Sequence, residues 1–229
     1  TFSHLHVRTT LEALEAGHNV LCEKPLARTP DEVDRLTALA ERQGRVLAIF
    51  QQSRYAAYFQ LIKQVIASGV LGRIVQISIQ FNGHSRRWDW QTLCEFNGGN
   101  LLNTGPHPLD QALELFGEGE PEVWCRMDRT EGSVGDAENH VKLLLSGEDH
   151  PLIDLEISSC CAYPPFTYQV YGSRGGLRAT QTEAAWRYYD PAAAPELRLQ
   201  REPLANEQGD PIYPGEKIDW VERKWPEEK

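Results

Sequence analysis

The fold is decided by residues 19–50, NVLCEKPLARTPDEVDRLTALAERQGRVLAIF, which hold two apolar runs separated by a helical stretch. Residues 19–22 predict a short buried strand, and residues 46–50 form a continuous apolar run, as in a parallel strand that is covered on both faces. Between them, Thr29-Pro30-Asp31-Glu32 is a capping box with proline at the first helical position, and Gly44 ends the helix. Strands joined through such a helix form a βαβ crossover, so these residues predict part of a parallel α/β sheet.

The hydrophobic period changes after this unit. From residue 75, apolar and polar residues alternate, and the pattern recurs downstream, which predicts five or six mostly antiparallel strands with one face on a core. The tail from residue 190 is rich in proline and charge and predicts loop, with one short strand at 197–199 and no terminating element. The stretches assigned as further helices are 9–16, 55–68 and 107–116, and those assigned as strands are 75–81, 123–127, 141–145, 153–157 and 166–170.

The predicted fold class is therefore the end of a parallel α/β domain followed by an α+β domain on an open, mostly antiparallel sheet. A cleft between the two is the natural ligand site. The formal charge of −10 disfavours nucleic acid and anionic membranes, and no apolar run approaches the length that crosses a bilayer, so a small-molecule partner is favoured. Five cysteines without CxxC spacing predict structural buried thiols in a reducing compartment, and hence a cytoplasmic protein.

Lys24 follows the first apolar strand directly, within Glu23-Lys24-Pro25. Ligands bind outside the carboxyl ends of strands in open α/β sheets, so this lysine is placed to donate to a substrate hydroxyl. Partial desolvation would lower its pKa and bring it into proton transfer. The alternative is a solvated lysine paired with Glu23.

A second candidate stretch is Gly98-Gly99-Asn100-Leu101-Leu102-Asn103-Thr104-Gly105-Pro106-His107-Pro108-Leu109-Asp110. His107 lies near a helix N-terminus, which favours a neutral general base, and Asp110, three residues on, could orient it. The alternative is a capping histidine with a solvated aspartate. The loop before it brings Asp89 and Trp90, a polar and aromatic pairing that is common in sugar sites and in ordinary interdomain loops alike. Histidine spacing does not favour a metal.

These two stretches, in this order, resemble the glucose–fructose oxidoreductase and inositol dehydrogenase family, Gfo/Idh/MocA. The resemblance implies a Rossmann domain that binds NAD or NADP, here residues 1–52, and a substrate-binding and oligomerisation domain, residues 53–229. It also implies reversible oxidation of a secondary alcohol on a sugar or cyclitol. Separately, the polar face of the predicted open sheet could bury against a second copy, so we expect a homodimer or homotetramer formed through that face.

Residue by residue, Lys24 resembles the family lysine that bonds the reacting hydroxyl, and His107 the catalytic acid/base. Asn103 stands where many members carry aspartate, and because an amide cannot take a proton, proton transfer would fall on His107. We expect Glu23, Pro25, Gln52 and His6 at the cofactor, and Arg54, Trp90, Asp89 and Thr104 at the substrate.

Members of the family begin with a strand and a GxGxxG turn that lie upstream of Thr1 by this resemblance, and they continue past Lys229. The sequence is therefore expected to hold the substrate side of a site without the phosphate-binding turn. A non-catalytic module that binds a sugar or a partner chain on the same fold is the competing hypothesis.

Overall fold

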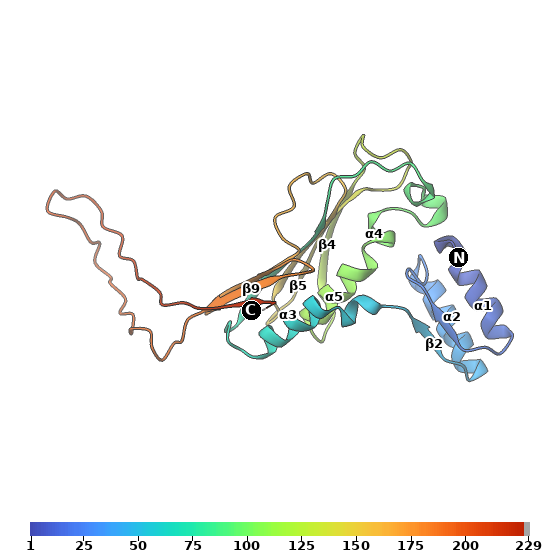
Figure 1. The fold of residues 1–229 in the computed structure, drawn as a ribbon, viewed down its shortest axis with the longest axis horizontal. Helices are drawn as coiled ribbons and strands as arrows, with labels where there is room; N and C mark the ends of the chain where they lie inside the picture. The colour runs from blue at the N-terminus through green and yellow to red at the C-terminus, as the bar shows by residue number, and fades with distance from the viewer. Residues whose placement is uncertain (227–229) are drawn as a thin grey trace.

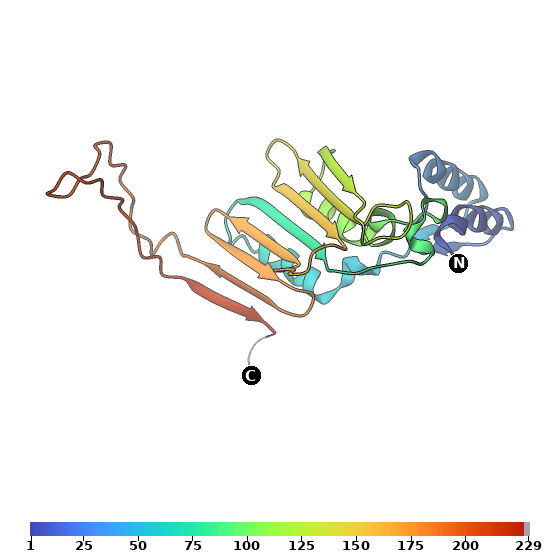
Figure 2. The same cartoon turned by 90° about the horizontal axis from the view of Figure 1, so that it is seen from above.

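A computed structural model describes residues 1–226 and shows two sheets joined in sequence through α3 (Figure 1). The smaller, two-stranded sheet lies at the N-terminal end with its helices, and the larger, eight-stranded one forms the body (Figure 2). Within residues 1–226, no helix is long and apolar enough to cross a membrane.

The N-terminal unit is the predicted βαβ crossover. Its elements are η1 (Ser3–Leu5), α1 (His6–Glu15), β1 (Val20–Cys22), α2 (Pro30–Gln43) and β2 (Leu47–Ile49), and β1 pairs with β2 in parallel. Thr29 caps α2 in a complete capping box with Glu32, and Gly44 ends it at φ 61°. Both helices pack on one face of the strands. The opposite face exposes Leu21 and Val46, so the predictions of a buried strand at 19–22 and of a strand covered on both faces at 46–50 were wrong for these residues.

The larger sheet has the order β10-β9-β8-β7-β3-β6-β5-β4. All neighbouring strands are antiparallel except β3 and β6, so the open, mostly antiparallel sheet is confirmed, with eight strands rather than five or six. The strands are β3 (Ile74–Asn82), β4 (Glu122–Asp128), β5 (His140–Ser146), β6 (Leu152–Ser158), β7 (Tyr168–Gly172), β8 (Gly175–Ala179), β9 (Ala184–Tyr188) and β10 (Val221–Trp225).

The core lies on one face of this sheet, under the two long helices α3 (Ala57–Ala67) and α5 (Pro106–Phe116). Fully buried side chains such as Phe59, Ile77 and Leu155 fill it. Tyr168 is also fully buried, and its hydroxyl donates to Gln111 of α5, which joins the helix to the sheet. Among residues 1–226, no helix lies on the other face of the sheet (Figures 1 and 2).

The C-terminal prediction needs two corrections. Residues 197–199 form no strand, because they lie in a long excursion that projects from the sheet (Figures 1 and 2). The chain then returns as β10, so the described part does end on a regular element, an edge strand paired with β9. Residues 227–229 lie outside the described range. The thiols of Cys125 and Cys160 are exposed, so buried structural cysteines were also a wrong expectation there.

Candidate active site

The candidate site lies where the carboxyl ends of β1 and β2 face α5 and the short helix α4 (Asn100–Asn103). A cavity of about 860 Å³ opens there, and most of its lining atoms belong to apolar side chains. It is lined by Lys24, Pro25, Leu26, Ala27, Val33, Leu47, Ile49, Phe50, Gln51, Gln52, Arg54, Tyr55, Leu101, Leu102, Pro106, Leu109 and Asp110. Residues of the N-terminal unit, of the segment after β2 and of helices α4 and α5 therefore build one concave surface.

Lys24 reaches across this junction. Its Nζ donates to the backbone carbonyl of Asn103 at 2.5 Å, and the side chain is partly buried. Burial lowers the pKa of Lys24 from its ordinary value, and the neighbouring Glu23 carboxylate opposes that shift. The structure therefore does not have the alternative of a solvated lysine at the surface. The Lys24 ammonium is partly desolvated and is held at the end of α4 by its hydrogen bond to Asn103.

His107 is held by residues that follow β2. Its Nδ1 lies 3.1 Å from Gln51 Oε1 and 3.2 Å from Ser53 Oγ. Gln51 directly precedes η2 (Gln52–Tyr55), and Ser53 lies within it. The Gln51 amide nitrogen donates to the Pro106 carbonyl at 2.6 Å. Only the NH₂ group can donate to a carbonyl, so the amide oxygen is the atom that faces His107.

This orientation fixes the tautomer of the imidazole. Because Gln51 presents an acceptor, the proton of neutral His107 sits on Nδ1, and Nε2 is left as the unprotonated nitrogen. Burial lowers the pKa of His107, the positive charge of Lys24 lowers it further, and Glu23 and Asp110 partly oppose both effects. A neutral imidazole with a free Nε2 has the state that a general base needs.

Asp110 does not orient His107, contrary to the prediction from their spacing. Its carboxylate accepts two hydrogen bonds from Arg54, at 2.7 and 2.6 Å, and Glu114 lies 3.6 Å from the same guanidinium. This bidentate pair ties η2 to α5. Arg54, predicted to bind substrate, lines the cavity but is already paired there.

Asn103 is held through its side chain. Its Oδ1 accepts from Gln91 Nε2 at 2.9 Å, and Gln91 in turn accepts from Arg87. Arg87 makes a bidentate pair with Asp89, whose carboxylate also caps η3 (Trp90–Thr92) through the Gln91 backbone at 2.8 Å. Asp89 thus acts within the loop, at one end of a chain of contacts that reaches Asn103.

The other predicted site residues are placed as follows. Trp90 packs edge-on against Phe2, with ring centroids 5.1 Å apart. Thr104 ends α4, and its carbonyl accepts from the His107 backbone at 3.2 Å. Gln52 is exposed at the cavity. His6 is buried, and its Nδ1 lies 2.8 Å from the Pro25 carbonyl, so it supports the loop after β1 from behind and does not line the cavity.

Sequence reasoning missed Gln51, Ser53 and Gln91. Gln51 carried a usable signal, because it is polar and comes directly after the second parallel strand, the same position rule that singled out Lys24. Nothing in the spacing of Gln91 indicates Asn103 as its partner. Within residues 1–226, no group of three or more His, Cys, Asp or Glu side chains could hold a metal ion.

Comparison with known proteins places the chain in a family. Residues 59–178 match the GFO/IDH/MocA C-terminal domain, and residues 1–51 match the oxidoreductase family with an NAD-binding Rossmann fold. The chain belongs to the Gfo/Idh/MocA oxidoreductases.

Two curated relatives and one solved structure illustrate the similarity. The chain is 36% identical over 121 residues to D-glucoside 3-dehydrogenase of Escherichia coli, covering 50% of this chain and 34% of that protein. It is 31% identical over 119 residues to scyllo-inositol 2-dehydrogenase (NADP(+)) IolW of Bacillus subtilis, covering 51% and 33%. An NAD-binding protein from Listeria innocua shares the fold with a TM-score of 0.77 at 22% identity, covering 86% of this chain and 58% of that one. The alignments thus span about a third of each curated relative.

Proposed function

We propose that the chain is the substrate side of an NAD(P)-dependent dehydrogenase that oxidises a secondary alcohol of a sugar or cyclitol. The observation that carries the proposal is the pair formed by Lys24, a partly desolvated cation, and His107, a neutral imidazole with a fixed tautomer. Family membership and the dehydrogenase relatives support the reaction class. We assign residues 1–52 to the cofactor domain and 53–229 to the substrate domain.

The cavity fits a nicotinamide ring. Its wall beside Lys24 is apolar, formed by residues such as Pro25 and Leu26, and it lies outside the carboxyl ends of β1 and β2. In this proposal Pro25 and Gln52 contact the ring, Glu23 lies beside it, and His6 acts only by supporting Pro25. When bound, the nicotinamide supplies the hydride acceptor.

In the proposed reaction, Lys24 Nζ exchanges its bond to the Asn103 carbonyl for one to the reacting hydroxyl oxygen. The hydroxyl proton passes to His107 Nε2 while the carbon of the same C–O bond loses a hydride, and the product is a ketone. The Asn103 amide, which cannot take the proton, holds a further hydroxyl by hydrogen bonding. Asp89, Trp90 and Arg54 shape the substrate side by fixing the loop and η2.

The test is a reduction assay on the intact gene product with NAD and NADP against a panel of sugars and cyclitols. We expect turnover with at least one polyol, and loss of turnover with retained cofactor binding in His107→Ala. Normal cofactor binding with every substrate inert would overturn the proposal and favour the non-catalytic sugar-binding module. A control variant, Gln64→Ala on the exposed side of α3, is expected to leave turnover unchanged.

We also propose that the open face of the eight-stranded sheet binds a second copy, giving a homodimer or homotetramer in the cytoplasm. The polar side chains on this face are paired with one another. Lys142 lies 2.5 Å from Asp154 and 3.1 Å from Glu156, and Glu156 accepts from Asn82 at 2.7 Å. Trp124 on the edge strand β4 is 52% exposed on the same face. Sedimentation showing a monomer at micromolar concentration would count against this assembly.

A further inference from the structure

An arm of about thirty residues leaves the sheet between β9 and β10. We define the arm as residues 191–219; it extends away from the body in both views (Figures 1 and 2). Its tip is internally bonded: the Asn206 backbone donates to the Asp210 carbonyl at 2.9 Å, and Ile212 donates to the Leu204 carbonyl at 2.8 Å. The arm therefore has local structure although it projects from the rest of the molecule.

The arm exposes large apolar side chains. Leu197, Leu199 and Tyr213 are 77%, 81% and 87% exposed, far more than side chains of this size in a packed protein. It also carries six acidic residues against three basic ones. An arm that is apolar, acidic and unsupported by its own body has the composition of a segment that is covered by another surface.

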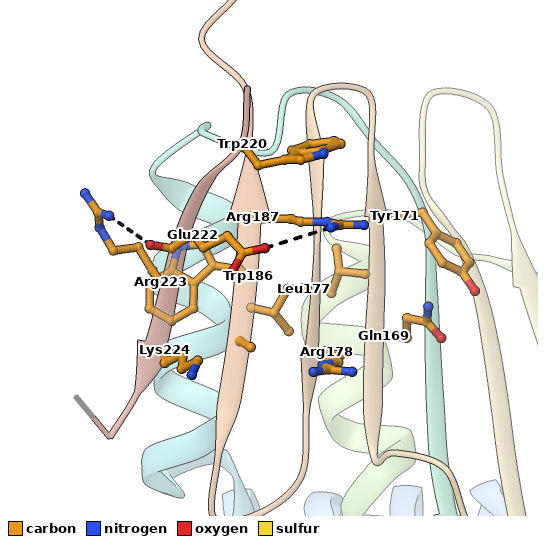
Figure 3. A pocket seen from close by; sticks show the side chains of 13 residues that line it. Gln169, Tyr171, Leu177, Arg178, Trp186, Arg187, Trp220, Glu222, Arg223 and Lys224 are labelled. Atoms are coloured by element: carbon orange, nitrogen blue, oxygen red, sulfur yellow. Dashed lines mark hydrogen bonds and ion pairs between the residues drawn. The ribbon is translucent and has the colours of Figure 1, made fainter. Parts of the chain in front are cut away.

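A cavity with the opposite charge lies on the open sheet face at the root of the arm (Figure 3). It has a volume of about 460 Å³ and lies on the side of β7–β10 away from α3 and α5, which are seen behind the strands. It is lined by Gln169, Val170, Tyr171, Gly176, Leu177, Arg178, Ala185, Trp186, Arg187, Trp220, Glu222, Arg223 and Lys224. Three basic side chains, Arg178, Arg187 and Lys224, and one acidic side chain, Glu222, lie on the open face, whereas Arg223 alternates with them on β10 and points away (Figure 3).

The cavity combines aromatic surface with cationic groups. The Arg187 guanidinium stacks over the Trp220 ring at 4.8 Å and lies 3.9 Å from Glu222. Tyr171 is 42% exposed at the other side, and Arg178 lies further along β8, opposite Gln169 of β7 (Figure 3). Such a surface suits an acidic segment that also brings leucine or tyrosine side chains.

We propose that the arm of one copy docks in this cavity on a second copy of the chain. The charge of the arm complements that of the cavity, and the exposed leucines and Tyr213 complement its aromatic wall. Because the arm points away from its own cavity, the exchange is between copies, and a twofold axis makes it reciprocal. The inference rests on the proposed pairing of two copies through the open sheet face, and it adds the arm as a second contact that stabilises the pair.

The direct test is a crosslink that distinguishes copies. A photoreactive phenylalanine derivative replaces Tyr213 in the intact gene product, which is mixed as ¹⁴N and ¹⁵N protein, irradiated and mapped by mass spectrometry. We expect mixed-isotope crosslinks from position 213 to residues 169–187 and 220–224. Crosslinks confined to one copy, or interchain crosslinks to other surfaces, would overturn arm docking.

A matched pair of variants gives an independent measurement. Leu197→Ser combined with Tyr213→Ser removes the exposed apolar anchors, and we expect the dimer dissociation constant to rise by about tenfold or more. Gln208→Ser, an exposed polar position on the same arm, is expected to leave it unchanged. A stable dimer that is indifferent to the double variant refutes the arm and leaves face pairing standing, whereas a monomeric parent protein refutes both. Catalytic turnover, measured separately, reports on the site proposal alone.

Discussion

Replacing Gln51 with glutamate puts a negative charge beside the candidate base with almost no change of shape. In the parent protein the Gln51 amide oxygen lies 3.1 Å from His107 Nδ1, and the amide nitrogen bonds the Pro106 carbonyl. In Gln51→Glu, one carboxylate oxygen still accepts the Nδ1 proton, so the tautomer is kept. The bond to Pro106 is lost, because an ionised carboxylate has no donor.

The expected magnitude follows from the contact. An opposite charge within 4–6 Å changes a pKa by about 1–3 units, each worth about 1.36 kcal/mol. Burial and Lys24 hold the pKa of His107 below its ordinary value, so the acid limb of kcat/KM in the parent protein lies below about pH 6.5. We expect Gln51→Glu to raise that limb by about 1–3 units, because the imidazolium form gains a partner. Once His107 is neutral again at higher pH, the rate should return to within a few fold of the parent.

The assay is the pH dependence of kcat/KM from about pH 5 to 9, together with NMR titration of the His107 Cε1 proton, assigned with His107→Ala. The control is Gln64→Glu, which adds the same charge to an exposed position of α3. An acid limb that stays in place in Gln51→Glu, or one that moves equally in Gln64→Glu, would refute the reasoning. A rate that stays low at every pH would show that Gln51 does more than orient and tune His107.

Three further substitutions probe other contacts. Lys24→Met should lower kcat/KM roughly 10- to 100-fold, by loss of a charge-assisted hydrogen bond of about 1.5–3 kcal/mol. It should also move the acid limb to higher pH, because the cation that lowers the pKa of His107 is removed. An acid limb that stays in place in the pH profile would count against this effect of Lys24 on His107. Tyr168→Phe leaves the buried acceptor of Gln111 without its donor, and urea unfolding should show a loss of about 1–3 kcal/mol. Arg54→Ala removes the bidentate pair with Asp110, but because the Arg54 side chain is 47% exposed, the cost is about 0.5–1 kcal/mol, or a Tm lower by about 1–4 °C in a thermal scan.

Local signals with a short physical range were readable from the sequence. The capping box at Thr29 and the glycine at position 44 fixed both ends of α2 to the residue, because a cap depends on the residues beside it. The continuous apolar runs placed β1 and β2, and family motifs indicated Lys24 and His107. These signals do not report which other elements cover a strand. For this reason the exposed face of the small sheet was not predicted.

Two of the three strands that were missed, β8 and β10, have atypical composition. β8 begins with Gly175 and Gly176, which are rare in strands because they contribute no side chain to a sheet surface. β10 is an edge strand with three charged residues in succession at 222–224. Charged residues on an edge strand discourage pairing with strands of other chains, but they also replace the alternation of apolar and polar residues that marks a strand. Neither pattern can be recognised until the neighbouring strand is in place.

The pairing of Arg54 with Asp110 was not predictable for a different reason. His107 and Asp110 do share one helix face, so their spacing was read correctly, but the nearest cation comes from η2, far away in sequence. A strong bidentate partner outcompetes a weaker contact with a neutral imidazole. Ser53 of η2 and Gln51, the residue directly before it, then contact His107 in place of Asp110.

The contacts around His107 make its state depend on how the two parts of the molecule meet. Lys24 Nζ reaches the Asn103 carbonyl at one point, and Gln51 reaches the Pro106 carbonyl at another. Two separate attachments to the segment 100–107 restrict rotation as well as separation of β1 and β2 from α4 and α5. The same two residues act on His107, since the charge of Lys24 lowers its pKa and the Gln51 amide oxygen accepts from its Nδ1. A displacement that breaks these attachments therefore also removes the contacts that favour a neutral imidazole protonated on Nδ1, which is the state that the proposed reaction requires of His107.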